Sequence, residues 1–254
     1  MKIIILAAGK GERLMPLTRN TPKPLLVLGD GKTLLEEQME RIHSSGLIHE
    51  VVIVTGYLGA QIDAKMATLK LPDLRIRTVF NPFYEHSNNL ISMWLARYEM
   101  DRDFLITNGD NLFDAAIFRE FAEANPAPGI HLSVNRKSSF DDDDMKVTLH
   151  NGIVARVSKK IPAEEAHGES PGLALIRGPR AIDAFIRVMD EIVRQPGGLN
   201  LFWLEAFNLL HEKGIPVQPW LSDFEGRWQE LDFHPDVSLL NKLLVGTSRP
   251  APVP

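Results

Sequence analysis

The chain has 254 residues, of which 44% are hydrophobic and 24% are charged, a composition typical of a globular protein with one sizeable core. Its formal net charge of -5 disfavours a nucleic-acid-binding surface, and the absence of cysteine excludes disulfides and cysteine-ligated metals. No apolar stretch approaches the ~18 residues of a membrane span, and the first residues are typical of a strand rather than a signal peptide. We therefore expect a cytoplasmic protein with no membrane contact and no nucleic-acid partner.

The N-terminal residues combine a predicted strand with a glycine-bearing turn and two cations. The apolar, β-branched run 2–6 leads through two alanines to Gly9 and Gly11, and Arg13 and Lys23 follow. Backbone N–H groups of such a turn can approach an anion closely, because glycine has no Cβ in the way. The pattern lacks the third glycine of a dinucleotide fingerprint and the GK[ST] of a P-loop, so a turn with ordinary packing glycines is an equal alternative.

The first half of the chain alternates predicted strands and helices. Thr33 and Glu36 have the spacing of a capping box, which predicts the start of a helix that Gly46 ends. Such alternation predicts a doubly wound α/β sheet with ligands at the carboxyl ends of its strands. The predicted strands after 2–6 are 51–55, 75–80 and 104–107, and the predicted helices are 33–45, 57–69, 88–98 and one capped by Asp114.

The second half contains shorter, alternating strands that we expect to cover the substrate. Asn151-Gly152 is a hairpin-type turn between two of them. We expect one domain over 1–246, with a nucleotide-binding half (1–127) and an acceptor-binding half (128–246), and a disordered tail over 247–254. The predicted strands are 131–134, 146–149, 153–157, 173–176, 217–221 and 228–231, and the predicted helices are 179–194, 201–213 and 235–244.

Three acidic residues are candidate metal ligands. Asp110 follows the strand 104–107, and an acid at that position suits Mg²⁺, which needs only one or two protein carboxylates beside phosphates and waters. Glu230 and Asp232 alternate along a predicted strand, so both point to one face. From spacing alone, Asp110 could equally shape a turn, and Glu230 and Asp232 could lie on a solvated edge.

The residues 6–13 and 22–26 together resemble the LAAGxGxR…PKxLL signature of the sugar-phosphate nucleotidyltransferase superfamily. The segments 81–96, 144–147 and 228–232 resemble one branch of it, the bacterial phosphocholine and aminoethylphosphonate cytidylyltransferases. The resemblance extends to about residue 244. It implies a Rossmann-like α/β fold of the nucleotide-diphospho-sugar transferase type, a mostly parallel central sheet with helices on both faces and a small substrate-covering region.

The resemblance also implies a reaction and its residues. It implies Mg²⁺-dependent transfer of CMP from CTP to a small phosphomonoester or phosphonate, with release of pyrophosphate. Arg13 and Lys23 would be catalytic, and Asp110 with Glu230 or Asp232 would hold the metal. Asn89 and Ser92 would lie near the base. The remaining residues expected to bind the nucleotide are Leu6, Ala7, Ala8, Gly9, Gly11, Glu12 and Gly109.

The acceptor site is less constrained by the sequence. Lys146 and Lys159 are by default solvated charges at strand edges, but within the resemblance they could reach an acceptor phosphate, and we expect Lys146 to be the better candidate. We expect the acidic run 141–144 to be a solvated loop, since adjacent like charges repel. The remaining residues expected to bind the acceptor are Glu169, Trp203 and Glu205, although a tryptophan is more often core than ligand contact.

Two other functions remain open at this point. One is a hexose-1-phosphate uridylyl- or thymidylyltransferase, which Gly109-Asp110-Asn111 favours and the segments 88–92 and 228–232 disfavour. The other is a nucleotide-binding regulator without catalysis, which the presence of Arg13, Lys23 and Asp110 disfavours. The expected partners are CTP, or another nucleoside triphosphate, and a small phosphorylated acceptor, and a homodimer is left open.

Overall fold

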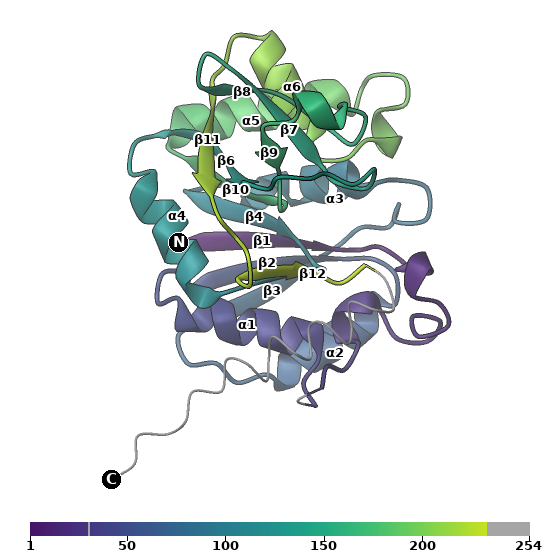
Figure 1. Cartoon of the computed structure of the whole chain (residues 1–254). Coiled ribbons are helices and arrows are strands. Elements are labelled where there is room, and N and C mark those ends of the chain that lie inside the picture. The colour runs from purple at the N-terminus through teal and green to yellow at the C-terminus, as the bar shows by residue number, and fades with distance from the viewer. Residues whose placement is uncertain (30, 233–254) are drawn as a thin grey trace.

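The computed structural model describes residues 1–29 and 31–232, which share one ten-stranded sheet of order β3-β2-β1-β4-β10-β6-β9-β7-β8, with β11 paired to β6 (Figure 1). The expected helix 235–244 and tail 247–254 lie outside the described residues. The division into halves at residue 127 stays a prediction. Over the residues described, no helix has both the length and the apolar composition to cross a membrane.

Residues 2–108 contribute four parallel strands. Strands β3 (Arg75–Phe80), β2 (Glu50–Thr55), β1 (Lys2–Ala7) and β4 (Phe104–Asn108) run side by side in the same direction. Every residue of β1 is buried, which explains its continuous apolar run, because helices cover both faces of this sheet. The carboxyl ends of β1 and β4 are neighbours, so the glycine turn and the segment around Asp110 meet there.

The second half extends this sheet with strands of mixed direction. Strand β10 (Leu173–Arg177) is antiparallel to both β4 and β6 (Gly129–Asn135), and β11 (Val217–Ser222) is parallel to β6. Strands β9 (Gly168–Glu169), β7 (Lys146–His150) and β8 (Ile153–Ser158) form an antiparallel edge. The expected turn joins β7 to β8, with both Asn151 and Gly152 at positive φ. The expected mostly parallel α/β sheet is confirmed, and the expected role of its antiparallel edge in covering the substrate stays a prediction.

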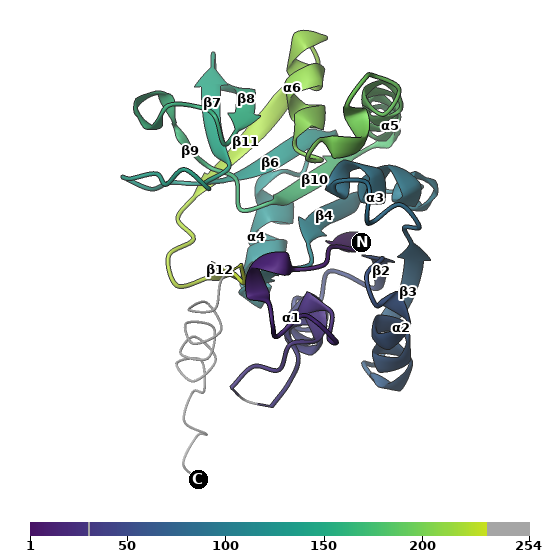
Figure 2. The same ribbon diagram turned by 90° about the vertical axis from the view of Figure 1, so that its right-hand side faces the viewer.

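Two layers of helices sandwich the sheet. Buried side chains of α1 (Leu34–Ser44), α2 (Gly59–Thr68) and α4 (Ala115–Ala124) pack on one face. Those of α3 (Asn89–Leu95), α5 (Pro179–Ile192) and α6 (Glu205–Glu212) pack on the other (Figures 1 and 2). The core therefore lies on both sides of the central strands and leaves their carboxyl edge free for a site.

Helix boundaries follow their capping chemistry. The expected capping box of α1 is confirmed, since the Thr33 hydroxyl accepts from the Glu36 N–H and the Glu36 carboxylate accepts from the Thr33 N–H. Asp114 caps α4 as expected. The expected helix 201–213 begins later, at Glu205, and the Trp203 N–H before it donates to the side chain of Asn89.

A short second sheet completes the arrangement beside the carboxyl edge. Strand β12 (Trp228–Glu230) pairs antiparallel with β5 (Asn111–Phe113), so that Glu230 lies opposite Asn111. The Leu231 N–H then donates to the Asp110 carbonyl oxygen at 2.9 Å. This pairing brings Glu230 and Asp232 to Asp110, which is far from them in the sequence.

Candidate active site

A pocket of about 580 Å³ lies at the carboxyl ends of β1 and β4. Its floor is the glycine turn, and Gly11 has a φ of +64°, which L side chains rarely adopt. A Cβ at Gly109 would lie 2.8 Å from that of Ala7, so the two strand ends approach closely only because Gly109 is a glycine. The lining includes every residue expected to bind the nucleotide, and their individual roles stay predictions: Leu6, Ala7, Ala8, Gly9, Gly11, Glu12, Asn89, Ser92 and Gly109.

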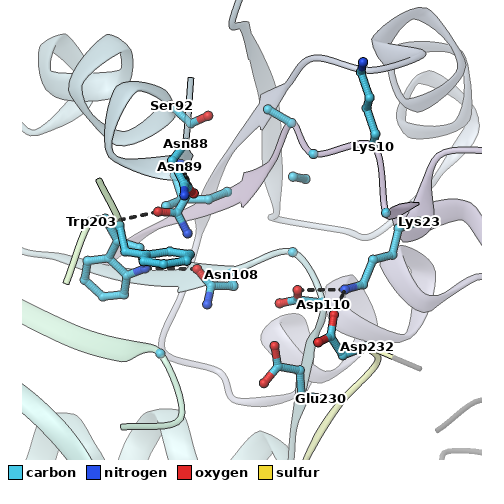
Figure 3. Close-up of a pocket in the computed structure, with 18 of the residues that line it drawn as sticks. Lys10, Lys23, Asn88, Asn89, Ser92, Asn108, Asp110, Trp203, Glu230 and Asp232 are labelled. Atoms are coloured by element: carbon cyan, nitrogen blue, oxygen red, sulfur yellow. Dashed lines mark hydrogen bonds and ion pairs between the residues drawn. The ribbon is translucent and has the colours of Figure 1, made fainter. Parts of the chain in front are cut away.

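Lys23 lies between two of the candidate metal ligands. Its Nζ donates to Asp110 Oδ2 at 2.9 Å and to Asp232 Oδ1 at 3.2 Å (Figure 3). Burial lowers the pKa of the ammonium, but Asp110 and Asp232 more than offset this, so the pKa of Lys23 is raised. Lys23 therefore carries a full positive charge beside the glycine turn.

The three candidate carboxylates form one cluster. One oxygen each from Asp110, Glu230 and Asp232 lies within 4.8 Å of the others. Burial and the negative charge of Asp110 raise the pKa of Glu230 to about 8. Asp110 Oδ1 is buried and has no hydrogen-bond partner among the described residues, although Oδ2 of the same carboxylate is paired. An unpaired oxygen in a group of crowded carboxylates fits a hard divalent cation.

Arg13 is held by carboxylates from two other segments. Its guanidinium binds Asp232 and donates to Asp143 Oδ2 at 2.7 Å, and Lys159 Nζ donates to Asp143 Oδ1 at 2.7 Å. Asp143 thus joins Arg13, from the first half of the chain, to Lys159, from the second half. The acidic run 141–144 is a loop whose first three residues are exposed, as expected, and Lys137 also binds Asp144, at 2.6 Å.

The opposite end of the pocket has amide and hydroxyl groups instead of charges. Asn89 and Ser92 project from α3, which Asn88 caps (Figure 3). Ser92 is buried rather than solvated, and its hydroxyl oxygen accepts from Asn81 Nδ2 at 3.0 Å. The pocket therefore has one end suited to phosphates and metal and another suited to a neutral, polar group.

The expected acceptor residues divide into two groups. Lys159 and Glu169 line the pocket, whereas Lys146 and Glu205 do not. Lys146 is buried and donates to the Asp141 carbonyl oxygen at 2.8 Å, and Glu205 accepts from Asn208 at 2.6 Å. The structure therefore places Lys159 and not Lys146 at the pocket, because the buried ammonium of Lys146 binds the nearest backbone carbonyl, and a contact of either lysine with an acceptor stays a prediction.

The aromatic residue expected beside them, Trp203, is among the residues that line the pocket. Its side chain is fully buried, and its ring packs edge-on against Phe207 with centroids 5.5 Å apart. Its ring has no exposed surface, and its expected contact with an acceptor stays a prediction. Phe202, the next residue along the wall, is 41% exposed and lies under Lys159, whose Nζ is 5.8 Å from the ring centroid.

Comparison with known proteins agrees with this geometry. The family model described as "Nucleotidyl transferase" matches residues 2–137. The chain belongs to the nucleotidyl transferase family. It is 40% identical over 245 residues to the choline-phosphate cytidylyltransferase of Streptococcus pneumoniae, covering 96% of this chain and 98% of the relative. It is 28% identical over 208 residues to the 2-aminoethylphosphonate cytidylyltransferase of Lancefieldella rimae, covering 81% of this chain and 78% of the relative.

A solved structure gives the same result in three dimensions. The CTP:phosphocholine cytidylyltransferase structure from Streptococcus pneumoniae superposes with a TM-score of 0.77 at 26% identity, covering 96% of this chain and 98% of that one. These matches confirm the resemblance to the cytidylyltransferase branch, which short motifs indicated, and they extend over 96% of this chain. The chain is an enzyme of this family.

Some pocket residues of this nucleotidyltransferase were missed by sequence reasoning. The lining also includes Asn108, Asp143, Lys10 and Glu85, and Lys10 and Glu85 form an ion pair at 3.3 Å. Asn108 directly precedes Gly109 at a strand end, so its position was a usable signal. Asp143 gave none, because nothing in a run of four aspartates shows which of them faces a distant arginine.

Glu169 should make the stability of this nucleotidyltransferase depend on pH. Burial and the nearby Asp144 raise its pKa from 4.5 to about 7, against the opposing effect of Lys137. The folded state then holds the proton more tightly than the unfolded state, so the free energy of unfolding falls as pH rises from 4.5 to about 7. Glu169→Gln should reduce that fall by at least about 1 kcal/mol in urea unfolding at pH 5 and pH 8.

The matched control is Glu165→Gln, which makes the same change at an exposed position four residues earlier, in the turn before β9. It should unfold with the pH dependence of the parent. An equal fall in the parent and in Glu169→Gln would show that Glu169 does not titrate in this range.

Proposed function

We propose that the enzyme transfers CMP from CTP to a small phosphorylated acceptor that also carries a positive charge, and that it releases pyrophosphate. The observation that carries the proposal is the position of Lys23, held between Asp110 and Asp232 beside the glycine turn. There a cation and a set of metal-type carboxylates converge on the place where a triphosphate would lie. The relatives named as cytidylyltransferases for choline phosphate and 2-aminoethylphosphonate support the choice of nucleotide and acceptor.

The residues present fit a magnesium ion. Asp110 has a buried oxygen with no partner among the described residues, and one oxygen each of Asp110, Glu230 and Asp232 lies within 4.8 Å of the others. All three are hard oxygen ligands, as Mg²⁺ requires. When bound, the ion would neutralise phosphate charge and orient the triphosphate.

The chain's own residues align and neutralise the reacting groups. An oxygen of the acceptor phosphate attacks the α-phosphorus of CTP, the bond from that phosphorus to the bridging oxygen breaks, and pyrophosphate leaves with its electron pair. A phosphate is already a nucleophile, so no general base is required. Backbone N–H groups of the glycine turn hold the triphosphate, Arg13 and Lys23 neutralise its charge, and Lys159 meets the acceptor phosphate.

The part of the pocket that we assign to the acceptor contains both a positively and a negatively charged type of side chain. Lys159 and the exposed face of Phe202 lie on one side, and Glu169 lies on another wall of the same pocket. A molecule with a phosphate at one end and an ammonium group at the other matches this arrangement, since the phosphate pairs with Lys159 and the ammonium with Glu169 or the aromatic face.

Nucleotide preference tests the proposal. The parent enzyme should use CTP at least ~10²-fold better than UTP in kcat/KM, measured by pyrophosphate release, because a site that hydrogen-bonds one base leaves groups unpaired with the other. Asn89→Ala should reduce that ratio rather than slow both reactions equally. Asn125→Ala is the control, since Asn125 lies outside the pocket and donates to the Phe121 carbonyl oxygen at 2.8 Å. A parent that prefers UTP or dTTP would overturn the proposal.

A further inference from the structure

Trp203 binds two asparagines at the uncharged end of the pocket. Its backbone N–H donates to Asn89 Oδ1 at 2.9 Å, and its indole N–H donates to Asn108 Oδ1 at 3.0 Å. Figure 3 shows the two amides reaching Trp203 from α3 and from the end of β4. A donor can bind only the oxygen of an amide, so both asparagines have their carbonyl oxygens turned toward Trp203 and away from the pocket.

The amide nitrogens are therefore left for a ligand. Both asparagines line the pocket, and neither Nδ2 has a hydrogen-bond partner within the described part of the chain. Gly172 also lines the pocket and leaves room for the Asn108 amide nitrogen, because a Cβ at this position would lie 2.8 Å from Asn108 Nδ2. Asn89 and Asn108 thus present N–H donors to whatever occupies this end.

The direction of the Ser92 hydrogen bond is also fixed by a neighbouring asparagine. The Phe83 N–H donates to Asn81 Oδ1 at 2.8 Å, which fixes the Asn81 amide with its Nδ2 toward Ser92 at 3.0 Å. Because the Ser92 oxygen accepts this bond, its own hydrogen remains to be donated. Three side chains at this end, Asn89, Ser92 and Asn108, are consequently set as donors by groups buried behind them.

We propose that Trp203 is a specificity-determining positioning residue, which holds Asn89 and Asn108 as donors toward the acceptor edge of cytosine. Cytosine has two adjacent acceptors, O2 and N3, whereas N3 of uracil carries a hydrogen and repels a donor. Donors on the side chains of Asn89 and Asn108 can therefore bind O2 and N3 of cytosine. With uracil, a side-chain N–H would point at the hydrogen on N3. The inference rests on the proposed function, because it explains how that site would select CTP.

The test compares two tryptophan variants that lose the same group. Trp203→Phe keeps the ring against Phe207 and the backbone N–H on Asn89, but it removes the indole N–H and frees Asn108 to turn its carbonyl oxygen toward the base. We expect the ratio of kcat/KM for CTP over that for UTP to fall about 10-fold. Trp94→Phe is the control, because its indole N–H binds Asp190 at 2.6 Å outside the pocket. It should keep the parent ratio.

Asn108→Asp gives an independent readout should Trp203→Phe fold poorly. The carboxylate still accepts from the indole N–H, but it offers the pocket an acceptor where the amide offered a donor. This variant should lower the ratio at least as far as Trp203→Phe, through a higher KM for CTP. A parent that prefers CTP, combined with a folded Asn108→Asp variant of unchanged ratio, would overturn the role of Trp203 and leave the proposed function standing. A parent that prefers UTP would overturn the proposed function itself.

Discussion

Lys23→Ala is expected to lower kcat by about 10²-fold or more while the fold is retained, the size of effect seen when one charge-stabilising donor is removed from a transition state. Lys23 is the cation that touches both Asp110 and Asp232, at 2.9 and 3.2 Å. Its removal leaves the carboxylate cluster without that neutralising charge and the leaving pyrophosphate without a partner. The loss should appear in kcat rather than in KM for CTP, because the charge on the leaving group develops during the reaction.

The matched control for this variant is Lys213→Ala. Lys213 follows α6 and pairs with Glu191 at 2.7 Å, away from the pocket. Pyrophosphate release by this variant should equal that of the parent. A folded Lys23→Ala enzyme with near-parental kcat would remove Lys23 from the mechanism.

Asp110→Asn is expected to abolish the activation of pyrophosphate release by Mg²⁺. The amide keeps the shape of the side chain, but it loses the charge that holds a hard cation and replaces one oxygen ligand with a nitrogen that carries hydrogens. The oxygen at stake is Asp110 Oδ1, which is buried without a partner among the described residues. The measurement is a Mg²⁺ titration of initial rate at saturating CTP.

The other two carboxylates should give smaller effects in the same titration. Glu230→Gln and Asp232→Asn should each raise the Mg²⁺ concentration needed for half-maximal rate, and Asp232→Asn should be the more severe because Asp232 also binds Arg13 and Lys23. Asp114→Asn is the control, since it makes the same chemical change at the cap of α4, outside the pocket. Parental titrations in all three cluster variants would show that the metal site lies elsewhere.

Local sequence signals predicted much of the fold. The spacing of Thr33 and Glu36 predicted the start of α1, and the Asn151-Gly152 pair predicted the β7–β8 turn, because short-range chemistry decides both. The order of β10 between β4 and β6 left no such trace. Strand order depends on which buried faces pack together, and runs as similar as 131–134 and 173–176 do not distinguish their neighbours.

The residues of the candidate site likewise differ in how far the sequence predicted them. The glycine turn, Arg13, Lys23 and Asp110 lie in contiguous motifs, so their convergence followed from the predicted parallel sheet. Lys146 and Lys159 both looked like strand-edge charges, and only the folded loop 141–144 shows that one binds backbone carbonyls and the other faces the pocket. The structural role of Trp203 depends on hydrogen bonds to two residues about 100 positions away, which no local pattern reveals.

The most direct measurement for the central claim is a product assay. The parent enzyme is given each of CTP, UTP, ATP, GTP and dTTP with phosphocholine, 2-aminoethylphosphonate or glucose 1-phosphate, and both pyrophosphate and the nucleotide-linked product are quantified. We predict pyrophosphate together with a CDP- or CMP-linked product from CTP and one of the two charged acceptors, and little turnover from the other pairs. Turnover confined to UTP or dTTP with glucose 1-phosphate would contradict the account.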